Sequence, residues 1–116
     1  MNNFEQGSIV LVDFTYSNQQ QSKLRPALVV SNSEYNRISR DIVVMKITSR
    51  EPKLWSVCIG NEDLLAGSLD YISYVQTDSL YSLEKTIIVD SIGILAPEKM
   101  RDIKNQISDL FALTKK

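Results

Sequence analysis

Histidine is absent from this sequence of 116 residues, and cysteine occurs once, as Cys58. The absence of histidine excludes Ser-His-Asp and Cys-His nucleophile pairs, HExxH zinc sites and RNA hydrolysis by a pair of histidines. A single cysteine excludes an internal disulfide framework and, without histidine, leaves no zinc-ligand set. An enzyme with this composition therefore has to work with arginine, lysine, hydroxyl groups or carboxylates.

Glycine and long apolar runs are also scarce. Only four glycines occur, and neither a GxxxxGK[ST] nor a GxGxxG motif is present, so a phosphate-cradling loop is not expected. The apolar runs fall far short of the roughly 20 residues of a membrane helix, and the first residues do not resemble a signal peptide. We therefore expect a cytoplasmic protein without a membrane partner. With 43% hydrophobic and 23% charged residues, the sequence is typical of one globular domain spanning residues 1–116.

Basic residues are not in excess, because 13 Lys and Arg face 14 Asp and Glu for a formal net charge of -1. The charge is nevertheless uneven along the chain. Residues 22–53 hold seven basic and three acidic side chains, whereas the rest of the chain holds six basic and eleven acidic ones. A locally basic surface of this kind suits a groove that binds phosphates, and it is equally consistent with a solvated face of mixed charge.

Short apolar, β-branched segments predict a chain made mainly of strands, and polar segments separate them. A mobile loop is expected over residues 15–23, a connection over 62–68, and one helical turn over 33–40 with Ser33 as its N-cap. We expect Pro26 at the first position or edge of its strand, and Trp55 and Cys58 in the core. The predicted strands are 8–14, 27–30, 41–48, 54–59, 71–77 and 86–89.

A terminal helix begins at Pro97, since proline is favoured at a first helical position. Apolar residues then recur at helical spacing as one stripe, namely Met100, Ile103, Ile107, Leu110 and Phe111. Strands come first and one helix comes last, with short connections. This order predicts a β-rich α+β fold, in which a small, strongly bent antiparallel sheet or barrel is capped by a C-terminal helix.

Several short motifs, in their order and spacing, resemble one known family. The sequence Arg25-Pro26-Ala27-Leu28-Val29-Val30 follows a glycine, a strand and a polar loop, and Ile47-Thr48-Ser49 closes the strand that begins at Asp41. Further matches are Asn32, Asn36, Gly67, Ser73-Tyr74-Val75 and Ile92-Gly93-Ile94-Leu95. Together they cover nearly the whole chain, and they resemble the MazF/PemK family of toxins from type II toxin–antitoxin systems.

The resemblance implies a fold, an activity and partners. The fold is a small SH3-like antiparallel barrel of the MazF/PemK/CcdB type with a C-terminal helix. The activity is that of an mRNA interferase, a sequence-specific endoribonuclease that cuts single-stranded RNA without a metal or other cofactor. The 2′-OH of the substrate attacks and leaves 2′,3′-cyclic phosphate and 5′-OH ends. Implied partners are RNA, a second copy in a homodimer and a cognate antitoxin, with DNA reached only through the antitoxin.

The resemblance also implies site residues. The family's catalytic pair falls on Arg25 and Thr48, and no metal ligands are implied. Ser22 and Lys23 are expected in a loop that orders over RNA, and Tyr16, Tyr74 and Tyr81 are candidates for stacking on bases. The remaining substrate-binding candidates are Pro26, Ser49 and Ser79.

The chemistry suits these residue types, because the nucleophile belongs to the RNA and the protein need only position a phosphate and stabilise charge on its oxygens. A planar guanidinium donates two N–H bonds to a phosphoryl group, and a hydroxyl serves one further oxygen. Arginine is effectively always protonated, so we expect Arg25 mainly to stabilise charge, with proton transfer secondary or assisted by solvent.

Two other functions remain open at this point. The same barrel can serve as a catalytically inactive RNA- or protein-binding module, including a toxin that poisons gyrase, because fold alone does not decide function. A metal-dependent nuclease without histidine would need clustered carboxylates. The candidates Asp70, Asp78, Glu84 and Asp90 fall on separate predicted elements.

Overall fold

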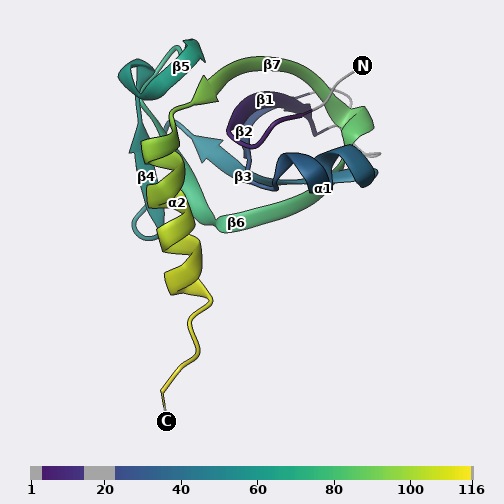
Figure 1. Ribbon diagram of the computed structural model, residues 1–116. Helices are drawn as coiled ribbons and strands as arrows, with labels where there is room; N and C mark the ends of the chain where they lie inside the picture. The colour runs from purple at the N-terminus through teal and green to yellow at the C-terminus, as the bar shows by residue number, and fades with distance from the viewer. Residues whose placement is uncertain (1–3, 15–22, 116) are drawn as a thin grey trace.

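The computed structural model describes residues 4–14 and 23–115. Within these residues, seven strands form one antiparallel sheet in the order β4-β6-β3-β2-β1-β7-β5. The sheet curls on itself, with β7 arching beside β1 and α2 lying against β4 and β6 (Figure 1). The predicted fold class is thereby confirmed. The strands are β1 (Ser8–Asp13), β2 (Leu24–Val29), β3 (Asp41–Thr48), β4 (Ser56–Ile59), β5 (Leu64–Gly67), β6 (Ser73–Glu84) and β7 (Ile88–Leu95). The helices are α1 (Ser33–Ile38) and α2 (Pro97–Leu110), with 3-10 turns η1 (Asn61–Asp63) and η2 (Lys85–Ile87).

The strands β1, β2 and β3 form an antiparallel meander. Pro26 is the third residue of β2 and pairs with Leu11 of β1, so the prediction of a first position was wrong. It lies outside the β2–β3 ladder, which begins where Ala27 pairs with Lys46. The missing N–H of proline is tolerated there because the strand still has an unpaired side.

The short helix α1 is capped by Asn32, not by Ser33 as predicted. The Asn32 side chain accepts a hydrogen bond from the backbone N–H of Tyr35 at 2.8 Å, which satisfies one of the orphan donors of the first turn. Asn36 of the same helix is buried, and its Nδ2 donates to the carbonyl oxygen of Phe4 at 2.8 Å. This bond ties α1 to the chain segment that precedes β1.

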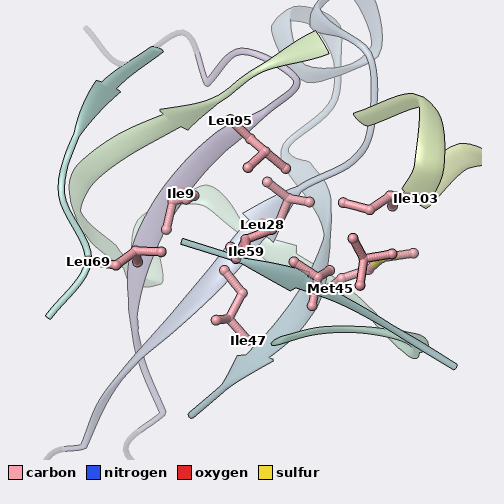
Figure 2. Close-up of a cluster of buried hydrophobic side chains, with 10 residues drawn as sticks. Ile9, Leu28, Met45, Ile47, Ile59, Leu69, Leu95 and Ile103 are labelled. Carbon is pink, nitrogen blue, oxygen red and sulfur yellow. The ribbon is translucent and has the colours of Figure 1, made fainter. Parts of the chain in front are cut away.

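Alternate residues of the strands supply apolar clusters to the two faces of the sheet. In β3, Ile42 and Val44 belong to one cluster, whereas Met45 and Ile47 belong to the other. The second cluster also includes Ile103 of α2, which is 1% exposed. Figure 2 shows its side chains converging from β1, β2, β3, β4, β7 and α2. The helix therefore covers the face of the sheet to which Met45 and Ile47 contribute, beside β4 and β6.

The segment 62–68 was predicted as a connection, but it contains the end of η1 and the edge strand β5. β5 pairs with β7, which begins two residues later than the start of the predicted strand 86–89 and continues to Leu95. Gly67 has a positive φ of 83° and lies directly against β7. A Cβ there would stand 2.0 Å from the carbonyl oxygen of Ile92, so this close approach requires glycine.

The long strand β6 pairs with both β3 and β4, and its register against β3 shifts in the middle. Met45 pairs with Leu80, whereas Ile47 pairs with Val75, which leaves residues 76–79 of β6 without partners in β3. Thr77 lies in this stretch, is fully buried, and donates from Oγ1 to Gln106 Oε1 of α2 at 2.7 Å. The register shift is therefore a docking point for the helix.

The helix α2 begins at Pro97, as predicted, and makes polar contacts with β4. Gln106 Nε2 donates to the carbonyl oxygen of Ser56 at 3.0 Å, and Lys99 Nζ donates to that of Cys58 at 3.2 Å. The Cys58 side chain is exposed, so its assignment to the core was wrong; it lies on the face of β4 opposite to buried Val57. Phe111, expected in the apolar stripe, is 66% exposed at the end of the helix.

Candidate active site

A cavity of about 490 Å³ opens where β1 ends, β2 begins and β3 ends. The sheet positions its walls, because neighbouring strands bring residues from distant parts of the sequence to one surface. The lining residues are Phe14, Lys23, Arg25, Pro26, Ala27, Val44, Lys46, Ile47, Thr48, Ser49 and Tyr81. Six of the ten residues that the sequence analysis named as candidates for catalysis, substrate binding or base stacking are among them.

Arg25 and Thr48 lie on neighbouring strands, at positions that correspond in the strand register. The β2–β3 ladder ends at the pair Ala27–Lys46, and continuing this register for two residues on each strand sets Arg25 opposite Thr48. Side chains two residues apart on a strand point to the same face, so both extend the row begun by Ala27 and Lys46. The guanidinium and the hydroxyl therefore face one cavity from two adjacent strands.

The Thr48 hydroxyl is fixed by its own backbone. Its Oγ1 accepts a hydrogen bond from the backbone N–H of Arg50 at 3.1 Å. A hydroxyl has one donor proton and two acceptor lone pairs, so accepting this bond leaves the proton available to a ligand. Thr48 is half-buried and Arg25 is exposed, which suits an oriented donor beside a solvent-accessible cation.

The cavity is strongly positive. Lys23, Arg25 and Lys46 line it, and no Asp or Glu is among its lining residues in the part of the chain that the structure describes. Phe14 and Tyr81 add aromatic surface, and Tyr81 is 45% exposed. Three cations with aromatic walls form an environment for a phosphate and a base, the two recurring parts of single-stranded nucleic acid.

The remaining predicted residues lie elsewhere. Ser22 and Tyr16 lie outside the described residues. Ser79 is in the β6 stretch without partners in β3, and it is not among the residues that line the cavity.

Tyr74 pairs with Thr48 across β3 and β6 but does not line the cavity either. Desolvation raises the pKa of the Tyr74 phenol, and the charges of Glu51 and Cys58 and a hydrogen bond with the Cys58 thiol raise it further. Its hydroxyl therefore keeps its proton to a higher pH than that of an ordinary tyrosine.

Sequence reasoning missed Lys46 and Phe14 as lining residues. The signal for Lys46 was present, because it precedes Thr48 by two residues in a predicted strand and so shares its face. It was counted only as one of the seven basic residues of 22–53, because charge alone does not distinguish a phosphate ligand from a solvated lysine. Phe14 was assigned to the end of a strand, and nothing in the local pattern distinguishes a core phenylalanine from one at a cavity wall.

The carboxylates weighed for a metal-dependent nuclease do not gather. Over residues 4–14 and 23–115, no group of three or more His, Cys, Asp or Glu side chains is placed to hold a metal ion. In the same residues, no helix is long and apolar enough to cross a membrane.

The sequence and the fold both match known proteins. Residues 5–111 match the family described as PemK-like, MazF-like toxin of type II toxin–antitoxin systems. The endoribonuclease MazF4 of Mycobacterium tuberculosis is 31% identical over 91 residues, covering 77% of this chain and 80% of that relative. An endoribonuclease from a mycobacterial species, solved with its cognate antitoxin, superimposes with a TM-score of 0.76 at 26% identity and full coverage of both chains. The fold also matches that of MazF in the MazE–MazF structure from Deinococcus radiodurans, with a TM-score of 0.79 at 19% identity over 98% of this chain and 100% of that one.

These matches define the class of protein as a toxin of a type II toxin–antitoxin system, built on a curled antiparallel sheet with a C-terminal helix. The chain belongs to the PemK/MazF family and is an endoribonuclease toxin of the MazF type.

Proposed function

We propose that this protein cleaves single-stranded RNA, including mRNA, at short specific sequences without a metal, and that the cavity between β2 and β3 holds the scissile phosphate. One observation carries the proposal: Arg25 and Thr48, from adjacent strands, line the same cation-rich cavity. In the reaction, the ribose 2′-oxygen bonds to phosphorus, the P–O5′ bond breaks, the 2′-OH loses its proton and the 5′-oxygen gains one. The products are a 2′,3′-cyclic phosphate and a 5′-OH.

The two residues have separate roles in this proposal. Arg25 donates two parallel N–H bonds to the non-bridging oxygens, on which negative charge accumulates in the transition state. Thr48 donates its free hydroxyl proton to one further oxygen, from a position set by its bond with Arg50. Lys23, Pro26 and Ser49 border the same cavity and contact the nucleotides on either side. Ser22 and Ser79 stay candidates for RNA contacts.

The test is digestion of a long, weakly structured RNA in EDTA by the wild type, by Arg25→Ala and by a matched control, Arg37→Ala. Arg37 is an exposed arginine on α1 that does not line the cavity. We expect discrete cuts with cyclic phosphate ends from the wild type and the control, and none from Arg25→Ala. Cleavage only after a divalent metal is restored would contradict the metal-independent mechanism. RNA binding without cleavage by the pure wild type would favour the binding-module alternative.

We infer three further binding partners of this protein. The first is a cognate antitoxin, since a mycobacterial relative is solved in complex with its own, and an acidic antitoxin segment would complement the charge of the cation-lined cavity. The second is a homodimer, which would shield apolar side chains such as Phe111 and Leu113, 66% and 94% exposed. The third is contact with DNA through the antitoxin alone. A cytoplasmic location fits all three, and sedimentation of the toxin with and without antitoxin tests the first two.

A further inference from the structure

Lys46 occupies an unusual position in the cavity wall. It lies in β3 between Met45 and Ile47, both buried, yet its own side chain is exposed on the opposite face. On the β2 side its partner is Ala27, whose side chain is too small to cover it. On the β6 side the register shift leaves it without a partner. The ammonium group is therefore open to the cavity from both neighbouring strands.

The spacing between Lys46 and Thr48 matches the distance between neighbouring phosphates of an RNA strand. Residues two apart on a strand share a face and lie about 6.6 Å apart. Successive phosphates of an extended RNA strand are separated by a similar distance. A strand that places one phosphate at Thr48 and Arg25 and continues along β3 therefore brings the next phosphate to Lys46. Beyond it lies Tyr81, which pairs with Val44 and lines the same cavity.

We propose, on the basis of the function proposed above, that Lys46 is a positioning residue that binds the phosphate adjacent to the scissile one. The RNA then runs along β3 from Thr48 toward Tyr81. Lys46 holds the strand in register and takes no part in bond making or breaking. One consequence is that cleavage depends on the charge of a single neighbouring linkage, the one on the side that extends toward Tyr81.

The test uses an oligonucleotide containing the cleavage sequence, in three forms. One has ordinary linkages, one has a neutral methylphosphonate on the 5′ side of the scissile linkage, and one has it on the 3′ side. We expect Lys46→Gln to lower kcat/KM about tenfold on the ordinary substrate, the lower end for a charge-assisted hydrogen bond. With the methylphosphonate on one of the two sides, wild type and variant should have equal kcat/KM. With it on the other side, the tenfold difference in kcat/KM should persist.

Binding to an uncleavable analogue with a 2′-deoxy sugar at the cleavage position tests the same idea without catalysis. Each phosphate contact contributes about 0.7 to the slope of log K against log salt for single strands, so Lys46→Gln should reduce that slope by about 0.7. Lys104→Gln is the matched control, because Lys104 is an exposed lysine on α2 away from this cavity. It should change neither the slope nor kcat/KM.

Two results would overturn the inference. The first is a defect of Lys46→Gln that persists unchanged with either methylphosphonate, since Lys46 would then act on the scissile phosphate or through diffuse charge. The second is a variant indistinguishable from the wild type in both kcat/KM and salt slope. Failure of the proposed function looks different, because the wild type would then cleave no substrate in EDTA, while the binding experiment would still report on Lys46.

Discussion

The hydroxyl oxygen of Thr48 accepts a hydrogen bond from the backbone N–H of Arg50, two residues later, at 3.1 Å. The bond orients a side chain at the last residue of β3, where the strand gives way to a loop. It occupies one of the two lone pairs of the oxygen and leaves the proton available to a ligand. The side chain is thus prepared as a donor before any ligand arrives.

Replacing Thr48 with valine should slow cleavage by about 100-fold or more, because valine has nearly the same shape but cannot donate a proton to the phosphate. Replacing it with serine should restore most of the rate, since serine retains both the donor and the bond to Arg50. Single-turnover cleavage of a short RNA measures both. Normal cleavage by Thr48→Val, with a loss in Thr48→Ser, would point instead to a packing role for the threonine methyl group.

Replacing Arg25 with lysine should also reduce kcat by about 100-fold, although the charge is kept. Lysine is a point charge with no planar pair of N–H groups to hold two phosphate oxygens at once. RNA affinity should change much less than the rate, because the overall charge of the cavity is preserved. A near-normal kcat for Arg25→Lys would show that charge alone is sufficient.

Gly67→Ala should destabilise the fold by about 3 kcal/mol, since a non-glycine residue at positive φ is strained and its Cβ would meet the backbone of β7. Urea unfolding followed by circular dichroism measures the loss. Ser68→Ala, at the exposed neighbouring position, is the control and should stay within about 0.5 kcal/mol of the wild type. A neutral Gly67→Ala would mean that β5 can move away from β7.

Gln106→Ala should cost about 1–3 kcal/mol, because it leaves the buried Thr77 hydroxyl and the carbonyl of Ser56 without their partner. Asn105→Ala, on the exposed face of the same helix, provides a control that alters helix composition but not docking. Chemical denaturation of the two variants separates these effects. Comparable losses in both would locate the cost in the helix itself and not in its contact with β4 and β6.

The raised pKa of Tyr74 predicts a loss of stability at alkaline pH. Above about pH 10 an ordinary tyrosine loses its proton in the unfolded chain, while folded Tyr74 retains it. The unfolded state then binds fewer protons, so the free energy of unfolding falls as pH rises through the folded pKa. Tyr74→Phe should show a smaller fall than the wild type. Tyr35→Phe, an exposed tyrosine on α1, should follow the wild-type curve.

Much of the fold could be predicted because several elements carry strong local signals. The strands at residues 8–13 and 41–48 are short and β-branched, and Pro97 marks the start of α2. β5 was missed because its four residues acquire strand structure only by pairing with β7, a contact that local pattern does not encode. β6 was predicted too short for a similar reason, since polar residues interrupt its alternation where the register shifts.

The site was predicted less directly. Arg25 and Thr48 were identified through the family resemblance, because a single threonine at the end of a strand is ordinary in itself. That they face one cavity follows from the β2–β3 register, which no single segment reveals. Lys46 was missed because its significance comes from what surrounds it, namely a small partner on one side and an absent partner on the other.

The docking of α2 also affects the tendency of the protein to aggregate in a crowded solution. β4 is an edge strand, and an edge with free carbonyl groups is a template on which another chain can add a strand. Gln106 and Lys99 occupy the carbonyl oxygens of Ser56 and Cys58, alternate residues of that edge. The helix that packs on the core thus also protects this edge from pairing with another chain, and detaching it would expose the two carbonyl groups.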